Sequence, residues 1–367
     1  MIVSDIKLHH YRLPVKRLLR VGDVALDDRQ GLILTIEAEG GCIGIGEVAP
    51  LPGYSPEALD EAVHQLRALR FRFKGAPVPE DIDELSGSFH RWLGAVCGSV
   101  RFGLESAVLS LAAEIKGSTL DGLLSASPLN SVPVNALLSG AGRDTAAAVR
   151  EIVDAGFRTL KLKVGWRDLD EDIAAVELLR KIAGPDTKIR VDANQRFTVD
   201  QVSRFVDAVS GANIEYLEEP TPPDQFREVC EILRNRRFAV PLALDESLTG
   251  LMPEQLTDFP DLGAIILKPS LLGLERSMQF ARMARARGVK VVISGMFESS
   301  VGISHLVRFA AAVIAPDTAA GLDTISWLDD DIVKPGVAAV GGSISLDSLP
   351  SLQRDLQWHK LVEVDTG

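Results

Sequence analysis

Short apolar runs alternate with amphipathic stretches from about residue 132 to about residue 322. The apolar runs have the length of buried strands, and the stretches between them repeat apolar positions with the period of a helix. This alternation predicts right-handed βαβ units and a parallel barrel. The predicted strands are 132–138, 159–164, 189–192, 214–218, 242–245, 264–268, 289–293 and 319–322. The predicted helices are 145–155, 169–182, 199–209, 225–235, 274–287 and 300–314, with barely two turns at 253–258.

The first part of the chain has a different pattern. Residues 1–50 are predicted to form antiparallel strands, with a hairpin signal at Glu39-Gly40-Gly41 between two apolar runs. Helical patterning follows at 55–71, 80–92 and 100–116. Strands followed by helices indicate an α+β domain.

Three parts are therefore expected along the chain. The α+β domain covers residues 1–125, and the barrel covers residues 126–325. Residues 326–367 lose the strand–helix alternation, so we expect them to pack back on the first domain.

One segment of the first domain, residues 15–30, shows no clear periodicity and carries Lys16, Arg17, Arg20, Asp28 and Arg29. The pattern predicts a loop. A surface loop and a lid over an anionic substrate are both compatible with it, because long irregular loops in compact domains often close over active sites.

Composition limits the function classes. The formal net charge of −12 argues against a general nucleic-acid binder. No run of about 18 or more apolar residues occurs, which argues against a membrane span, and the N-terminus lacks a signal-peptide pattern. Cys42, Cys97 and Cys230 fit no metal pattern and are expected to be reduced thiols of a cytoplasmic protein. No pattern indicates the oligomeric state.

Charged residues stand out on the strand at 159–164. Alternate side chains of a strand point to the same face, so Lys161 and Lys163 share one face, and Leu160, Leu162 and Val164 share the other. Taken alone, this pattern also fits an ordinary half-exposed strand with its lysines in water.

The following four strands also end in charged residues, which are Asp192, Glu218, Asp245 and Lys268. The steps from Lys163 onward are 29, 26, 27 and 23 residues, and each is one strand-plus-helix unit. The C-terminal ends of parallel barrel strands meet at one mouth, where barrel enzymes place their active sites. We therefore expect three acids and three lysines to converge there.

Asp192, Glu218 and Asp245 supply oxygen ligands without an accompanying histidine or cysteine, a set that favours Mg²⁺, or Mn²⁺, over zinc. Three carboxylates crowded without a cation would raise one another's pKa values. A single acid at a strand end is more simply a helix N-cap. Three at barrel spacing, flanked by lysines, favour a metal site.

A lysine can act as a general base only when it is neutral, and its ordinary pKa is about 10.4. A neighbouring lysine and a divalent cation both lower that pKa. Lys163 has Lys161 as such a neighbour, and Lys268 is expected across the mouth. A substrate carboxylate on the metal would then place its acidified α-proton between Lys163 and Lys268, and proton removal would give an enediolate.

These motifs resemble a known family. Lys-x-Lys at 161–163, Asp-Ala-Asn at 192–194, Glu-Glu-Pro at 218–220, Asp-Glu-Ser at 245–247 and Leu-Lys-Pro-Ser at 267–270 are similar to the muconate-lactonizing enzyme subgroup of the enolase superfamily. The resemblance covers nearly the whole chain, including residues 46–55. It implies a modified (β/α)8 TIM-type barrel, that is (β/α)7β, with an N-terminal α+β capping domain.

The resemblance also implies roles for single residues. Lys163 would be the base, Lys161 would bind and polarise the substrate carboxylate, and Lys268 would lie on the opposite face. The implied metal ligands are Asp192, Glu218 and Asp245, supported by Asn194 and Glu246.

Within the subgroup, the segments 294–302 and 320–324 look most like o-succinylbenzoate synthases. These enzymes of menaquinone biosynthesis dehydrate 2-succinyl-6-hydroxy-2,4-cyclohexadiene-1-carboxylate. The resemblance places Ser294, Gly295, Ser299 and Gly321 beside the substrate, although Ser299 fits simple capping of the next helix equally well. The chain departs from many relatives at Arg196-Phe197 and at Gly295-Met296-Phe297.

Two other functions remain open at this point. An N-succinylamino acid racemase or a dipeptide epimerase would use Lys163 and Lys268 as acid and base on two faces. Dipeptide epimerases typically carry two acids at the eighth strand, where this chain has only Asp323. A barrel kept as a non-catalytic binding protein is less compatible with three intact lysines and three intact acids.

Overall fold

The computed structural model of the protein describes residues 1–79, 81–85, 96–138, 145–234 and 240–364. Its N-terminal part is an antiparallel sheet with strand order β13-β1-β2-β3. The strands are β1 Val3–Val21, β2 Val24–Ala38, β3 Ile43–Val48 and β13 Val362–Glu363. The helices of this part are α1 Leu59–Phe73, α2 Ile82–Glu84, α4 Gly98–Ile115 and α5 Leu120–Leu124. The hairpin predicted at Glu39-Gly40-Gly41 is confirmed, since β2 and β3 pair on either side of it.

Helix α4 lies directly on β3. A Cβ atom at Gly44 would stand 2.0 Å from the carbonyl oxygen of Ala107, and one at Gly46 would stand 2.1 Å from that of Gly103. The two strand glycines therefore permit a close approach of helix and sheet that any larger residue would prevent.

The predictions for two helices of this part need adjustment. The helix expected at 55–71 begins at Leu59, because the Ser55 hydroxyl accepts a hydrogen bond from the Leu51 N–H (2.9 Å) and holds the chain in a turn. Of the helix expected at 80–92, the described residues contain α2, while residues 80 and 86–92 lie outside them.

The prediction of a loop at 15–30 is wrong. These residues continue β1 and begin β2, which pair across a tight turn at Gly22-Asp23. The pairing is irregular between Pro14 and Leu19, so the apolar alternation slips there and hides the strand pattern. Leu19 and Val21 are buried against residues of distant segments, which a local pattern does not reveal.

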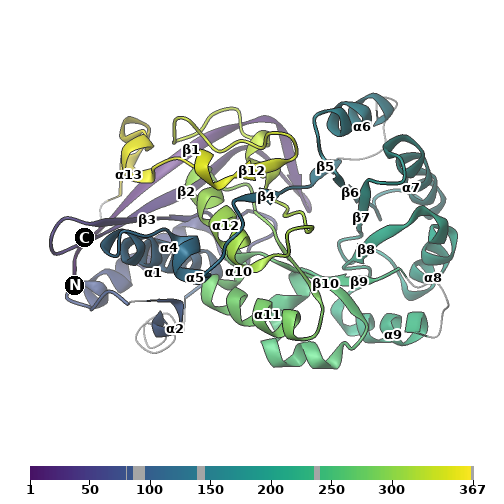
Figure 1. Ribbon diagram of the computed structural model, residues 1–367, viewed down its shortest axis with the longest axis horizontal. Coiled ribbons are helices and arrows are strands. Elements are labelled where there is room, and N and C mark those ends of the chain that lie inside the picture. The colour runs from purple at the N-terminus through teal and green to yellow at the C-terminus, as the bar shows by residue number, and fades with distance from the viewer. Residues whose placement is uncertain (80, 86–95, 139–144, 235–239, 365–367) are drawn as a thin grey trace.

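The second part is a parallel sheet with strand order β11-β10-β9-β8-β7-β6-β5, curled into a barrel (Figure 1). The strands are β5 Ala136–Leu138, β6 Thr159–Lys163, β7 Lys188–Asp192, β8 Ile214–Glu218, β9 Leu242–Leu244, β10 Leu262–Leu267 and β11 Lys290–Ile293. The helices are α6 Thr145–Asp154, α7 Leu169–Ala183, α8 Val199–Ala208, α9 Pro223–Arg234, α10 Pro269–Leu272, α11 Leu274–Ala286 and α12 Ser300–Val313. Short 3-10 helices are η2 Ser210–Ala212, η3 Glu246–Gly250, η4 Pro253–Asp258 and η5 Asp323–Trp327.

Two details of the barrel differ from the expected strands. The strand expected at 132–138 is divided into β4 Ser131–Pro133, which pairs with β12 Ser343–Ser345, and β5. The strand expected at 319–322 is reduced to single bridges, Val134 with Ala320 and Ser294 with Gly321.

Those bridges nevertheless close the ring. Ala320 N–H donates to the Pro133 carbonyl (2.7 Å), and Gly321 N–H donates to the Ile293 carbonyl (2.8 Å). The segment therefore joins the chain just before β5 to the end of β11, the two outermost strands of the sheet, and the expected modified barrel with an N-terminal α+β domain is confirmed.

The C-terminal segment contains η6 Leu346–Ser348, α13 Leu352–Asp355 and η7 Trp358–Lys360 before β13. Strand β13 pairs with β1, with Glu363 opposite His9. The N-terminus lies at the end of the molecule remote from α7 and α8 (Figure 1). The boundaries 1–125, 126–325 and 326–367 stay a prediction.

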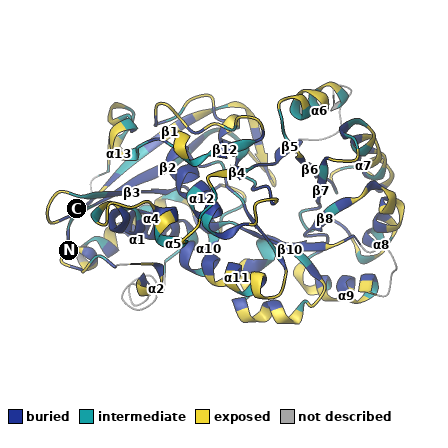
Figure 2. Ribbon diagram, in the orientation of Figure 1, coloured by how far each residue is buried: buried dark blue, intermediate teal, exposed yellow. Residues whose placement is uncertain are grey.

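Burial follows the two layers of the fold: the strands and the inner helix faces are buried, and the outer faces of α6 to α9 are exposed (Figure 2). Among the described residues, no helix is both long and apolar enough to cross a membrane.

Candidate active site

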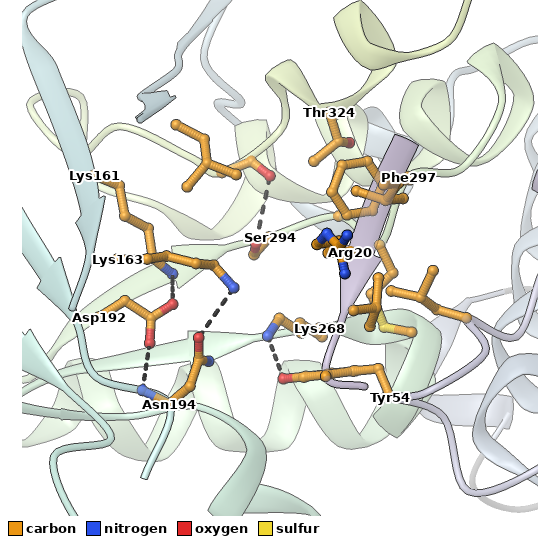
Figure 3. Close-up of a pocket in the computed structure, with 18 of the residues that line it drawn as sticks. Arg20, Tyr54, Lys161, Lys163, Asp192, Asn194, Lys268, Ser294, Phe297 and Thr324 are labelled. Carbon is orange, nitrogen blue, oxygen red and sulfur yellow. Dashed lines mark hydrogen bonds and ion pairs between the residues drawn. The ribbon is translucent and has the colours of Figure 1, made fainter. Parts of the chain in front are cut away.

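A cavity of about 1010 Å³ lies where the C-terminal ends of the barrel strands face the first domain. The first domain contributes residues Arg17 to Asp23 of the β1–β2 hairpin and the loop residues Leu51, Gly53 and Tyr54. The predicted site residues that line the cavity are Lys161, Lys163, Asp192, Asn194, Glu218, Glu246, Lys268, Ser294, Gly295 and Gly321. Figure 3 shows several of them converging from different strands.

Lys161 bridges two of the predicted acids. Its Nζ lies 2.6 Å from Glu218 Oε1 and 3.0 Å from Asp192 Oδ2. Strand register causes this contact, because β6, β7 and β8 are adjacent and Asp192 pairs with Glu218. Burial lowers the pKa of Lys161, but Asp192, Glu218 and Asp245 outweigh it and raise that pKa well above its ordinary value.

The two acids respond to this environment differently. Burial raises the pKa of Asp192, but Lys161 and Lys163 outweigh it and hold that pKa below its ordinary value. Burial, reinforced by Asp192, raises the pKa of Glu218 well above its ordinary value. Without a further cation, the single ammonium group of Lys161 does not stabilise the charged forms of both Asp192 and Glu218.

Lys163 has a neutral partner. Its Nζ donates to Asn194 Oδ1 (3.0 Å), and the Asn194 N–H donates to Asp192 Oδ1 (3.0 Å) (Figure 3). Asn194 has φ +42°, a left-handed conformation that asparagine tolerates better than most residues. The turn after β7 thus aims the Asn194 amide at Lys163.

Lys268 approaches from another strand of the barrel and contacts Asp245 and the Tyr54 hydroxyl. The Tyr54 hydroxyl also lies 3.3 Å from Glu246 Oε2. Burial lowers the pKa of Lys268, but Asp245 and Glu246 outweigh it and raise that pKa. Burial and Asp245 raise the pKa of Tyr54 well above its ordinary value, so Tyr54 is a hydrogen-bond donor at neutral pH.

Two glutamates lie near Asp245, the acid that follows β9, and only Glu219 supports it by hydrogen bonds. Glu219 Oε1 accepts the N–H groups of Asp245 (2.7 Å) and Ser247 (2.9 Å), and Glu219 itself has φ +40°. Glu246 lines the cavity, and burial together with Asp245 raises its pKa to about 8. Strained backbone at Glu219 and Asn194 lies at the candidate site, as is common for functional residues.

The predicted metal ligands have unused oxygens. Glu218 Oε2 and Asp245 Oδ1 are buried and have no hydrogen-bond partner. Such oxygens suit a hard divalent cation. Among the described residues, there is no group of three acidic, histidine or cysteine side chains close enough together to hold a metal. The acids of the site contact Lys161 and Lys268 instead. A cation there would compete with these two lysines for the carboxylates.

Of the four residues predicted to contact substrate, Ser294, Gly295 and Gly321 line the cavity. Ser299 does not: it is fully buried, caps α12 through the Val301 N–H (3.2 Å) and donates to Glu47 Oε2 (2.6 Å). The capping interpretation of Ser299 therefore matches the geometry, and the substrate-contact interpretation does not.

The sequence did not predict the contacts of several residues around the cavity. Arg196 stacks over the Trp166 ring at 3.4 Å, and Arg17 stacks over the Trp327 ring at 4.0 Å. Tyr54 lies within the 46–55 motif, but no sequence pattern places that loop against Lys268. Asp323 also lines the cavity, and burial raises its pKa to about 6.

Comparison with known sequences identifies both parts of the chain. Residues 144–352 match the family described as Enolase C-terminal domain-like, and residues 3–111 match the MenC N-terminal domain. The chain is 31% identical to an o-succinylbenzoate synthase from Yersinia pseudotuberculosis, over 96% of this chain and 98% of the relative. It is also 31% identical to the chloroplastic protein PHYLLO of Arabidopsis thaliana over 90% of this chain, which spans only 21% of that protein.

Solved structures share the fold. The N-succinyl Arg/Lys racemase from Bacillus cereus aligns with a TM-score of 0.86 and 21% identity over 100% of both chains. A dipeptide epimerase from Enterococcus faecalis, complexed with Mg and the dipeptide L-Leu-L-Tyr, aligns with a TM-score of 0.83 and 23% identity over 94% of this chain and 97% of that chain. With its two matched domains and its synthase relatives, the chain belongs to the enolase superfamily and, within it, to the o-succinylbenzoate synthase family.

Proposed function

We propose that the protein is an o-succinylbenzoate synthase, a lyase that removes water from 2-succinyl-6-hydroxy-2,4-cyclohexadiene-1-carboxylate. The observation that carries this proposal is the pair Lys163 and Lys268 on one cavity, with Asp192 and Glu218 among its lining residues. The match of residues 3–111 to the MenC N-terminal domain and the synthase relatives support this reaction over others of the superfamily.

We propose that the site works with a divalent cation, Mg²⁺ with Mn²⁺ as a possible substitute, held by Asp192, Glu218 and Asp245. When bound, the cation would neutralise charge that develops on the substrate carboxylate. The buried, unpartnered oxygens Glu218 Oε2 and Asp245 Oδ1 support this assignment. So does the complex of a dipeptide epimerase of the same fold with Mg.

In this proposal Lys163 carries both proton transfers. Its neutral Nζ takes the α-proton, and the resulting ammonium gives a proton to the departing hydroxyl, so that water leaves and the ring becomes aromatic. The neutral amide of Asn194 holds Nζ in place without fixing a positive charge there. Lys161, paired with Asp192 and Glu218, would orient the substrate carboxylate.

Lys268 would act as a cation on the other side of the substrate. Its ion pair with Asp245 and its contact with Tyr54 favour the charged form. A fixed positive charge stabilises the negative charge of the intermediate without exchanging a proton. The β1–β2 hairpin, with Arg17 and Arg20 on the cavity, would close over the bound small-molecule carboxylate.

A second candidate is racemisation or epimerisation of N-succinylamino acids or dipeptides, which would use both lysines chemically. The shared fold with the N-succinyl Arg/Lys racemase gives this alternative some support. In the segment 320–324, Asp323 is the one acid, and it faces the cavity. A single acid fits poorly with a dipeptide epimerase, which would use two acids there to bind the substrate ammonium. A non-catalytic binding barrel fits least, because Lys161, Lys163 and Lys268 are all placed on the cavity.

The test compares purified wild type with Lys163→Ala and Lys268→Arg on the cyclohexadiene substrate and on N-succinyl amino acids in deuterium oxide. Lys163→Ala should lose both dehydration and α-deuterium exchange. Lys268→Arg should lose much of the dehydration but keep some exchange through Lys163.

Lys188→Ala is the matched control, because Lys188 begins β7 at the end opposite Asp192 and pairs with Asp317 at the surface. It should leave both reactions unchanged. If Lys163→Ala keeps exchange while Lys268→Arg loses it, the two roles are reversed. Racemisation without dehydration by the wild type would replace the proposed reaction with the second candidate.

A further inference from the structure

Arg29 is a buried cation whose guanidinium donates to four main-chain carbonyl groups. Arg29 lies on β2, and the residue is only 1% exposed. On the first domain it donates to the Ala49 (2.9 Å) and Pro50 (3.0 Å) oxygens. On the barrel it donates to the Phe297 (3.2 Å) and Met296 (3.4 Å) oxygens. One guanidinium thus joins a loop of each domain.

The barrel side of this contact is a wall of the cavity. Met296 and Phe297 both line it, and Phe297 has φ +62°, a conformation that a bulky residue rarely adopts. The Met296 N–H donates to Glu298 Oε2 (2.6 Å), and the Phe297 ring packs edge-on against Trp327 at 5.8 Å. Glu298 therefore holds the N–H of Met296 and Arg29 holds the carbonyls of Met296 and Phe297, which keeps the unusual conformation of Phe297 in place.

Figure 3 shows Phe297 beside Arg20, across the drawn cavity from Lys161 and Lys163. The wall therefore faces the part of a substrate that is remote from the reacting carbon. A contact that binds the substrate and the transition state equally raises KM without changing kcat when it is lost, so loosening this wall should act mainly on KM while the reacting groups stay in place.

We infer that Arg29 is a positioning residue that sets the shape of the Met296–Phe297 wall, against which the succinyl tail of the substrate is fitted. This inference rests on the proposed function, because that function supplies the tail. Arg29 contacts the carbonyls of Met296 and Phe297 but is not among the residues that line the cavity, so we expect it to act through Met296 and Phe297.

The test compares Arg29→Lys with Arg180→Lys. Arg180 is the matched control, because it also donates to main-chain oxygens, those of Ala212 (2.7 Å) and Thr187 (2.7 Å), on the outside of the barrel and away from the cavity residues. Both variants should lower the melting temperature. Only Arg29→Lys should raise the KM for the cyclohexadiene substrate, by about tenfold or more, with kcat changed less than about threefold.

A double-mutant cycle adds a readout that a merely structural role would not move. Phe297→Gly accepts the positive φ without strain and removes the ring of the wall. If Arg29 acts through Phe297, the KM effects of Arg29→Lys and Phe297→Gly should be clearly less than multiplicative in the double variant. Fully multiplicative effects would overturn the inference, as would equal kinetics of Arg29→Lys and Arg180→Lys.

If Arg29→Lys does not fold, the KM and kcat of Phe297→Gly alone test the inference. A KM raised about tenfold with kcat retained supports the wall as the tail contact, and an unchanged KM overturns it. Absence of dehydration by the wild type defeats the proposed function and this inference together, whereas an active wild type with a silent Arg29→Lys defeats the inference alone.

Discussion

Buried carboxylates occur both between the two domains and at the barrel mouth, and their partners differ. Between the domains, Glu47 accepts the Ser299 N–H (2.9 Å), the Ser299 hydroxyl (2.6 Å), the Gly302 N–H (2.6 Å) and the Tyr11 hydroxyl. All four donors are neutral, and they come from β1 and from the start of α12. Both Glu47 oxygens are used.

At the mouth, two of the buried carboxylates have ammonium groups as partners. Glu218 pairs with Lys161 and Asp245 pairs with Lys268, and each carboxylate keeps one buried oxygen without a partner. Buried polar atoms are normally satisfied, so an unsatisfied one needs an explanation.

The difference separates a structural role from a chemical one. A carboxylate whose oxygens are all fixed by neutral donors holds two elements together but cannot accept another ligand. A carboxylate with a free oxygen and an ammonium partner can exchange that partner for a cation or a substrate. We therefore expect substitutions at the mouth to affect activity, and substitutions between the domains to affect stability.

The largest effect is expected from Glu218→Gln, which removes a proposed metal ligand. Loss of several kcal/mol of charge stabilisation corresponds to a fall in kcat/KM of about a thousandfold or more. Stability should change little, because the variant also removes a carboxylate whose burial is unfavourable. Steady-state rates before and after chelation, with Mg²⁺ restored, provide the measurement.

Asp245→Asn should weaken metal binding in the same titration. Full activity of rigorously metal-free wild type would contradict the metal assignment, and wild-type metal affinity in Glu218→Gln would remove Glu218 from the ligand set.

The second effect concerns the domain contact. Glu47→Ala leaves the Ser299 and Gly302 N–H groups buried without their acceptor, and we expect the free energy of unfolding to fall by about 3 to 5 kcal/mol. Urea denaturation measures this change. Enzyme that remains folded should keep most of its kcat, and Glu47→Gln, which retains one acceptor oxygen, should lose less stability. If Glu47→Ala keeps the wild-type free energy of unfolding but loses its kcat, the assignment of Glu47 to stability and not to activity is wrong.

The third effect is a pH dependence at the same contact. His305 on α12 is buried and donates through Nε2 to the Ile45 carbonyl (2.8 Å). Burial, assisted by Arg308, lowers its pKa from 6.5 to about 4. Below pH 6.5 the unfolded chain therefore binds a proton that the native protein excludes, so stability is lost as the pH falls from 6.5 toward 4.

By about pH 5 this histidine should account for a loss of about 2 kcal/mol in the free energy of unfolding. His305→Gln keeps a donor for the Ile45 carbonyl and does not titrate, so its stability should depend less on pH over this range. Parallel pH profiles of the two proteins in urea denaturation would contradict the assignment.

The strand-end residues of the site could be predicted from sequence because a parallel barrel converts regular spacing into proximity. Lys161, Asp192 and Glu218 meet through strand register alone. Tyr54 and Arg29 could not be predicted in this way, because each contacts residues more than 150 positions away whose placement depends on how the two domains pack.

Local pattern failed at the β1–β2 hairpin for a related reason. Its buried residues pack on Leu51 and Met296, and its irregular pairing after Pro14 breaks the alternation that would identify a strand. Glu219 was also missed as a structural support, because the sequence pattern assigns a role only to Glu218. The left-handed conformation of Glu219, which accompanies its hydrogen bonds to the Asp245 and Ser247 N–H groups, is not visible in the sequence.

The smallest effect should come from an exposed contact between the domains. Arg282 on α11 pairs with Asp83 on α2 (2.8 Å), and both side chains are more than half exposed. The same helix is joined to α4 by Arg101 and Glu275 (2.8 Å), whose side chains are largely buried. Water and salt screen the first pair but hardly affect the second, so Asp83→Ala should change the free energy of unfolding by only about 0.5 kcal/mol. Glu275→Ala leaves Arg101 short of a buried partner and should cost several times more. Equal losses for the two variants in the same urea titration would show that exposure does not govern the strength of this domain contact.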